Sequence, residues 1–299
     1  MIRVRPSFYD AFSCKASACR HSCCVGWEID VDADTRELYA AVEGGFGREL
    51  REKISSDAEP HFLLGADERC PFLREDGLCR IILELGEEAL CDVCAEHPRF
   101  YNVFPGREEA GLGLCCEETV RLLTEGEPFT LIEEDDGEDE ERDPWVERLA
   151  ILRREIDALL RRGSGAFECR LADAFSLFDA QPPLFDPAEW AAFLLTLERM
   201  DERWTFALQT LSRLTGAAWR KLLDDERYER IFRYLLYRHL IAAEGREEAR
   251  KLLAFCAVGT MTVCALDAAE PEARDEHLRL WSAEIEYSDE NVRRICEKL

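Results

Sequence analysis

The sequence predicts a mainly α, α+β protein: an irregular, cysteine-rich N-terminal region with short strands, followed by an all-α C-terminal region. Ten of the 14 cysteines lie before residue 117, and after residue 144 apolar residues recur at helical spacing almost throughout. Between them, nine of the residues from 133 to 143 are acidic, and such a self-repelling run is typical of a solvated linker. We therefore expect a cysteine-rich region over 1–130, an acidic linker over 131–143 and a helical domain over 144–299.

The N-terminal region carries signals of short elements. Trp27–Val31 alternates apolar and polar residues, which predicts a strand. Asp34 followed three residues later by Glu37 is typical of a helix start with a capping box. The stretches "RFYNVF" and "AGLGL" flank Pro105-Gly106, which predicts a hairpin. An irregular α+β region organised around its cysteines follows from these signals.

The C-terminal region is predicted to be helical from Pro144 onward. In "WVERLAILRREIDALL" the apolar residues recur at helical spacing. Asp186-Pro187 predicts another helix start, since proline suits the first turn of a helix. "RYERIFRYLLYRHLIAA" (227–243) is strongly apolar, so we expect it to form a central helix.

The composition excludes some classes of function. The net charge is −25, with 63 acidic and 38 basic residues. This argues against nucleic acid as a partner, because phosphates require lysine and arginine on the protein. No run of about 18 apolar residues is apparent, so no membrane span is expected. The N-terminus lacks the apolar stretch of a signal peptide, and we therefore expect a cytoplasmic protein.

The clustered cysteines point to a metal. In a reducing compartment disulfides are rare, so grouped thiols indicate metal ligands or catalytic groups. Their spacing is C-x4-C-x3-C-C, then "CPFLREDGLC", then the C-x2-C pair Cys91 and Cys94. Thiolates bind Zn²⁺ tetrahedrally and also hold iron–sulfur clusters, commonly with four cysteines for each cluster. Spacing alone leaves zinc and iron–sulfur as open alternatives. His21 lies among the first four cysteines, and we expect it to be exposed and not a ligand.

Several segments of the chain resemble the flagellin lysine-N-methylase family, which is related to small CxxCxxCC proteins described as zinc- or iron-chelating. The matching segments are "FSCKASACRHSCCVGWEIDVDADT" (12–35), "CPFLREDGLCRIILELGEEALCDVCAEHPRF" (70–100), "LGLCCEE" (112–118), "FRYLLYRHL" (232–240) and "WSAEIEYSDEN" (281–291). They occur in the family's order and span nearly the whole chain.

The resemblance implies methyl transfer from S-adenosylmethionine to lysine amines of flagellin, together with a bound iron–sulfur cluster of the four-iron type, with zinc as the alternative metal. By position it implies eight metal ligands: Cys14, Cys19, Cys23, Cys24, Cys70, Cys79, Cys94 and Cys116. It leaves Cys91 and Cys115 open, and between the adjacent Cys115 and Cys116 it favours Cys116. The adjacent Cys23 and Cys24 would then serve different ligand sets, with Gly26 allowing a tight turn after them.

Candidates for the chemistry of methyl transfer are fewer. Ordinary methyltransferases hold S-adenosylmethionine on a Gly-rich strand-to-helix turn, and the sequence has no such motif. A lysine amine must lose its proton before it attacks a methyl group, which requires a base or a desolvating pocket. Glu284 and Glu286 are candidates for the base, and Arg99 for a group that binds a carboxylate. The alternative is that the two glutamates belong to an amphipathic C-terminal helix and that Arg99 caps a helix or pairs with Glu96.

Two other functions stay open. The first is a non-enzymatic scaffold in which the cysteine-rich region holds zinc or iron. The second is a cluster-dependent enzyme of the same fold that modifies a different peptide. Iron content and visible absorption of the purified protein would separate the first from an iron–sulfur methylase.

Overall fold

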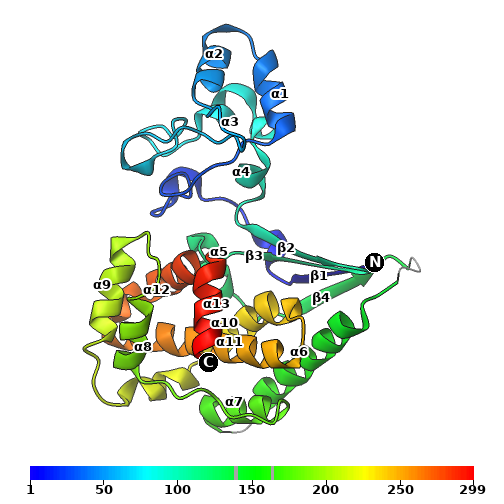
Figure 1. The fold of residues 1–299 in the computed structure, drawn as a ribbon, viewed down its shortest axis with the longest axis vertical. Helices are drawn as coiled ribbons and strands as arrows, with labels where there is room; N and C mark the ends of the chain where they lie inside the picture. The colour runs from blue at the N-terminus through cyan, green and yellow to red at the C-terminus, as the bar shows by residue number, and fades with distance from the viewer. Residues whose placement is uncertain (138–140, 163–164) are drawn as a thin grey trace. The chain divides into compact units, whose positions relative to one another are not determined.

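The computed structural model describes residues 1–137, 141–162 and 165–299 (Figure 1). These residues form two units, each with its own core. The helical unit comprises Met1–Phe12, Tyr101–Cys115 and Thr119–Leu299, and the cysteine unit comprises Ser13–Phe100 and Cys116–Glu118. The expected boundaries at residues 130 and 143 differ from this division, because segments at both edges of the cysteine region take part in the core and sheet of the helical unit.

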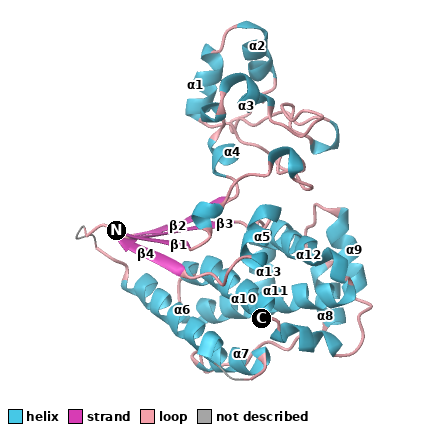
Figure 2. Cartoon of the chain, turned by 180° about the vertical axis from the view of Figure 1, so that it is seen from behind, coloured by secondary structure: helices cyan, strands magenta, loops and turns pink. Residues whose placement is uncertain are grey.

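The helical unit contains one four-stranded mixed sheet in the order β2-β3-β1-β4 (Figure 2). β1 (Ile2–Pro6) pairs in parallel with β3 (Arg107–Leu112) and antiparallel with β4 (Leu131–Asp135). β2 (Arg99–Phe104), whose first two residues belong to the cysteine unit, is joined to its neighbour β3 by the predicted turn at Pro105-Gly106, where Gly106 has a positive φ of 67°. The expected hairpin is therefore present.

The start of the expected acidic linker is a strand instead. Leu131 and Ile132 lie opposite Pro6 and Arg5 in the sheet. Arg5 neutralises part of the negative charge that follows, through its ion pair with Glu134 at 3.1 Å. Residues 138–140 of the expected linker lie outside the described residues.

Helices form the rest of the helical unit, as the sequence predicts. Their bounds are α5 Glu117–Glu125, α6 Pro144–Arg162, α7 Phe167–Ser176, α8 Pro187–Leu194, α9 Glu202–Leu211, α10 Glu226–His239, α11 Arg246–Ala269, α12 Arg274–Trp281 and α13 Asp289–Lys298, with a π-helix at Ser282–Glu286. Short 3-10 helices lie at Ala218–Asp224, Leu240–Ala242 and Pro271–Ala273. The first two residues of α5 belong to the cysteine unit.

Two of these helices bear on the sequence predictions. α8 begins at Pro187 as predicted, with the Asp186 carboxylate accepting hydrogen bonds from the backbone N–H groups of Ala188 and Glu189 at 3.0 Å. α11 is long and apolar enough to cross a membrane, but 89% of its most apolar window is buried inside the protein. It packs against α10, α12 and α13, as a core helix does.

The cysteine unit is built from short helices and turns around a small core. Its helices are α1 Ala33–Ala41, α2 Gly44–Glu52, α3 Arg80–Leu85 and α4 Asp92–Glu96, with 3-10 turns at Ala16–Ala18, Ala66–Glu68 and Glu87–Ala89. Another 3-10 turn, Tyr9–Ala11, lies in the helical unit. The helix expected near Asp34 is α1, and it is capped two residues earlier by Asp32, whose carboxylate accepts from the Thr35 N–H at 2.8 Å. The strand expected at Trp27–Val31 is absent from this described segment, which makes only the isolated bridge between Asp30 and His61.

Candidate functional site

One set of cysteines, here the outer thiols, lies around the start of α5. Its members are Cys14, Cys19, Cys23 and Cys116. The side chain of Glu117 is only 5% exposed, and it connects the start of α5 to the segment from Lys15 to Arg20. It forms an ion pair with Lys15 Nζ at 2.9 Å and accepts from the Arg20 backbone N–H at 3.2 Å. These contacts hold the chain that carries Cys14 and Cys19 beside Cys116. The Cys19 thiol accordingly interacts electrostatically with Cys116 and with Cys14.

The other set, here the inner thiols, belongs to the hydrophobic core of the cysteine unit. Its members are Cys24, Cys70, Cys79, Cys91 and Cys94, which pack with Tyr39, Phe62 and Phe72. The backbone N–H of Cys70 donates to the Cys24 carbonyl at 2.8 Å, and the N–H of Cys94 to the Cys91 carbonyl at 2.9 Å. The Tyr39 hydroxyl donates to the Ala89 carbonyl at 2.7 Å, which ties α1 to the segment before α4.

The adjacent Cys23 and Cys24 have different neighbours. Cys23 interacts electrostatically with Cys14 and Cys116, which are outer thiols. Cys24 interacts with Cys70, Cys79 and Cys94, which are inner thiols. The turn after them uses Gly26 at a positive φ of 81°, as the sequence predicts. That the two cysteines serve different ligand sets stays a prediction, and the arrangement of their neighbours agrees with it.

Two pairs of neighbouring thiols are coupled in their ionisation. The contact between Cys23 and Cys24 raises the pKa of Cys23 and lowers the pKa of Cys24 to about 6. The contact between Cys91 and Cys94 lowers the pKa of Cys91 and raises that of Cys94. In such pairs the first proton leaves easily and the second is held, because two adjacent thiolates repel each other.

The kinds of donor present fit a thiolate-bound metal centre. Soft sulfur ligands from several chain segments are what zinc and iron–sulfur centres use. In the part of the chain that the structure describes, however, no group of three or more Cys, His, Asp or Glu side chains is close enough to hold a metal ion as the side chains stand. The eight ligands implied by the resemblance stay a prediction.

The three residues proposed for chemistry occupy different settings. The Glu284 carboxylate accepts from the backbone N–H groups of Met200 and Asp201 at 2.8 and 2.9 Å, so it holds the start of α9 in place. Burial raises the pKa of Glu284. The Arg99 guanidinium lies 3.5 Å from the Ala95 carbonyl, in the cysteine unit. Glu286 lies in a buried cluster of charged and polar groups.

Glu286 is held between the end of α10 and the π-helix of the helical unit. Its carboxylate is 2.7 Å from His239 Nε2 and 3.7 Å from Arg238 Nε. Burial opposes ionisation, but the Arg238 charge and the His239 hydrogen bond outweigh it and lower the pKa of Glu286 to about 2. Burial lowers the pKa of His239, so at neutral pH an anionic carboxylate faces a neutral imidazole. Glu286 is therefore too weak a base to take a proton itself, and the imidazole beside it is the basic group.

Two further side chains complete this cluster. Arg238 lies over the Tyr287 ring, 4.6 Å from its centroid. A Cβ added to Gly113 would lie 2.0 Å from the Tyr287 hydroxyl and 3.3 Å from the Cys115 sulfur, so the backbone before Cys115 packs directly against Tyr287. The cluster of Arg238, His239, Glu286, Tyr287 and Cys115 joins segments from three parts of the sequence.

Comparison with known proteins assigns the family. No protein-family model matches the chain, and no solved structure matches it significantly. A lysine-N-methylase of Salmonella typhimurium is 34% identical over 138 residues, which are 44% of this chain and 34% of that protein. A lysine-N-methylase of Salmonella choleraesuis matches to the same extent. The flagellar biosynthetic protein FliU of Salmonella muenchen is 34% identical over 136 residues, which are 43% of this chain and 80% of FliU. The chain belongs to the lysine-N-methylase and FliU family.

The family resemblance predicted from the sequence is thus confirmed. The chain spans about a third of the length of the two curated lysine-N-methylases that it matches. The sequence pointed to Glu286 but not to its partners His239 and Arg238. The signal that could have found them is the position of both residues in "FRYLLYRHL", a segment already quoted for the resemblance.

Proposed function

We propose that this protein methylates lysine side chains of flagellin, with S-adenosylmethionine as the methyl donor and an iron–sulfur cluster of the four-iron type bound by its cysteine unit. The observation that carries the proposal is the 34% identity to FliU across 80% of FliU, together with the equal identity to lysine-N-methylases. We place the protein in the cytoplasm, where reduced thiols are kept available for a metal.

The cysteine unit would supply the ligands for the cluster. Four of the eight proposed ligands are the outer thiols, and the other four are inner thiols: Cys24, Cys70, Cys79 and Cys94. Cys91, the fifth inner thiol, is in contact with Cys94 and is the natural substitute within that set. A bound cluster would supply electron-transfer or Lewis-acid chemistry that the side chains lack.

His239 would accept the proton that the substrate lysine loses, with Glu286 as its partner. A lysine ε-ammonium must lose a proton so that the nitrogen lone pair can form a bond to the methyl carbon while the sulfonium C–S bond breaks. His239 Nε2 lies 2.7 Å from the Glu286 carboxylate, and because an ionised carboxylate only accepts, Nε2 would carry the proton and Nδ1 of the neutral ring would be the proton acceptor. Glu286 is the positioning group, since it fixes the ring and stabilises its protonated form.

The test is mass spectrometry of flagellin after anaerobic incubation with the protein and S-adenosylmethionine. We expect lysine methylation by the intact protein. His239→Gln should lower kcat by roughly 100-fold or more, the usual scale for a lost general base. Glu286→Gln should lower kcat and shift the acidic limb of the pH profile.

A matched control exists in the same unit. His277 Nδ1 pairs with Asp267 at 2.8 Å and is buried, but it lies outside the segments that resemble the family. His277→Gln should leave the pH profile unchanged. If His239→Gln keeps full kcat while flagellin is methylated, the acid–base assignment is wrong and the methylase proposal stands. If no preparation methylates flagellin, the methylase proposal itself is wrong.

A metal-binding scaffold is the second candidate, because the five inner thiols are also part of a hydrophobic core. In that function the metal would stabilise the cysteine unit and do no chemistry. A colourless protein that contains zinc and leaves flagellin unmodified would favour the scaffold, whereas absorption near 400 nm from an iron–sulfur cluster would favour the methylase.

A further inference from the structure

The helical unit has a cavity of about 480 Å³ between β4, α6 and α10. Apolar side chains such as Phe129, Leu236 and the Tyr237 ring form part of its lining. Six of the lining residues are charged, and four of these are the arginines Arg153, Arg154, Arg161 and Arg233. We refer to it as the arginine cavity.

The charge of the arginine cavity is opposite to that of the protein. Four guanidinium groups face two carboxylates, Glu133 and Asp157, in a chain whose net charge is −25. Asp157 is shared, because it pairs with Arg161 at 2.8 Å and also with Arg233. Glu133 likewise lies 3.3 Å from Arg154 and 3.6 Å from Arg107. With Arg107 and the two further carboxylates of this network, Glu109 and Glu147, five guanidiniums meet four carboxylates, so one positive charge is left over.

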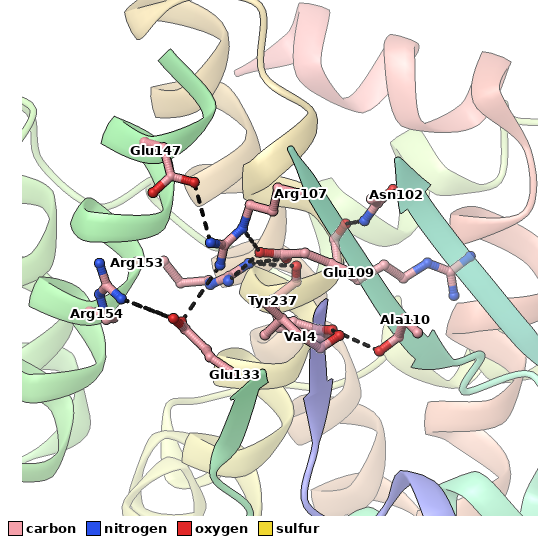
Figure 3. A network of polar contacts seen from close by, with 11 residues as sticks. Val4, Asn102, Arg107, Glu109, Ala110, Glu133, Glu147, Arg153, Arg154 and Tyr237 are labelled. Atoms are coloured by element: carbon pink, nitrogen blue, oxygen red, sulfur yellow. Dashed lines mark hydrogen bonds and ion pairs between the residues drawn. The ribbon is translucent and has the colours of Figure 1, made fainter. Parts of the chain in front are cut away.

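Two of the arginines are buried. Glu109 outweighs the burial of Arg153 and raises its pKa, so what Arg153 lacks is a partner for one N–H donor, whereas the charge of Arg233 is only partly compensated. The side chain of Arg153 is 5% exposed, and its two Nη atoms donate hydrogen bonds to the Glu109 carboxylate at 2.6 and 2.7 Å (Figure 3). Its Nε is buried and meets no hydrogen-bond acceptor among the residues that the structure describes. Arg233 is also 5% exposed, and burial together with the charge of Arg161 lowers its pKa. An anion in the cavity would supply an acceptor for Arg153 Nε and a further counter-charge for Arg233.

We propose that the arginine cavity is a binding site for a small organic anion with a carboxylate or phosphate group. Arginine pairs with both groups in a bidentate manner, and its charge-assisted hydrogen bonds are stronger than neutral ones. The more exposed Arg154 and Arg161 would reach the anionic group at the mouth, while Phe129, Leu236 and Tyr237 would contact the apolar body. The site is distinct from the cysteines and from the Glu286 cluster, so it does not depend on the proposed methylase function.

Isothermal titration calorimetry of the full chain with inorganic phosphate and with citrate tests the site. We expect saturable binding of at least one of the two, weakened by added salt because the attraction is electrostatic. Arg161→Gln and Arg154→Gln should each weaken it by roughly 10-fold or more, the equivalent of one lost charge-assisted hydrogen bond. Arg148→Gln is the matched control, since Arg148 is exposed on the same helix but does not line the cavity.

The outcomes separate the sources of the anion. Binding of phosphate alone would identify a phosphate ligand, and binding of citrate alone a carboxylate ligand. Failure of both to bind would overturn the proposal, and so would binding that is equally strong in the Arg161→Gln, Arg154→Gln and Arg148→Gln proteins. Circular dichroism of each variant shows that a lost affinity is not a lost fold, and Arg154, which is 53% exposed, is the variant least able to disturb folding.

Discussion

Glu109 is the carboxylate on which the buried network of the helical unit depends. It is fully buried and accepts from Arg107 Nε at 2.7 Å and from two Arg153 nitrogens at 2.6 and 2.7 Å (Figure 3). Replacing Glu109 with Gln keeps the shape but leaves two buried guanidiniums without their shared counter-charge. Removing one partner of a buried ion pair costs about 3–5 kcal/mol. Because the amide oxygen still accepts one hydrogen bond, we expect the lower end, about 3 kcal/mol, or a fall in Tm of roughly 6–12 °C.

The effect is measured by urea unfolding followed through tryptophan fluorescence, since five of the six tryptophans lie in the helical unit. Glu290→Gln is the control, because it removes an exposed ion pair with Arg293 and should leave the midpoint unchanged. A loss below about 1 kcal/mol for Glu109→Gln, at an unchanged m-value, would refute the assigned role of the carboxylate.

The same substitution carries a pH signature. Burial opposes ionisation of Glu109, but Arg153 and Arg107 outweigh it and lower its pKa below the usual 4.5. A carboxylate with a depressed pKa in the folded state adds stability that is present above pH 4.5 and is lost as the pH falls through the folded value. Glu109→Gln should therefore flatten the decline in stability below pH 4.5. An unchanged decline would show that other carboxylates cause it.

Gly113→Ala should lower the free energy of unfolding by about 1–3 kcal/mol, because the new Cβ would lie 2.0 Å from the Tyr287 hydroxyl. The control is Gly45→Ala, whose new Cβ meets nothing within 4 Å and should leave the melting temperature unchanged in the same thermal melts. Cys24→Ala should lower metal content and the stability of the cysteine unit together, because metal binding and folding are coupled; full occupancy in the variant would exclude Cys24 as a ligand. Methyl transfer to flagellin should slow as ionic strength rises, because the charge of −25 attracts a lysine-bearing surface and salt screens that attraction; initial rates at several salt concentrations test this.

Elements with local signals were predictable from the sequence. α8 follows from Asp186-Pro187, and the central position of α10 from the apolar run over 227–243. The sheet was harder, because β4 is stabilised by β1 from the far end of the chain, with Arg5 pairing with Glu134. Residues 133–135 of the acidic run lie in this strand, where the distant arginines Arg5 and Arg154 neutralise part of their charge.

The candidate site shows the same division. The cysteines are conspicuous in the sequence, and their clustering alone suggested a metal. Their division into outer and inner thiols depends on Glu117 and on the core around Tyr39, contacts that join residues far apart in the chain. His239 was missed because a histidine at the end of an apolar helix has no chemical signature until Glu286, 47 residues later, is brought to it.

The cysteine unit is proposed to hold the metal on which lysine methylation depends. The most direct measurement is the metal content and flagellin methylation of the same anaerobic preparations of wild type, Cys23→Ala and Cys169→Ala, where Cys169 is an exposed cysteine of the helical unit. We predict that Cys23→Ala loses metal and methylation together, while Cys169→Ala keeps both. Equal methylation by metal-loaded and metal-stripped wild type, or full activity of Cys23→Ala without metal, would contradict the claim.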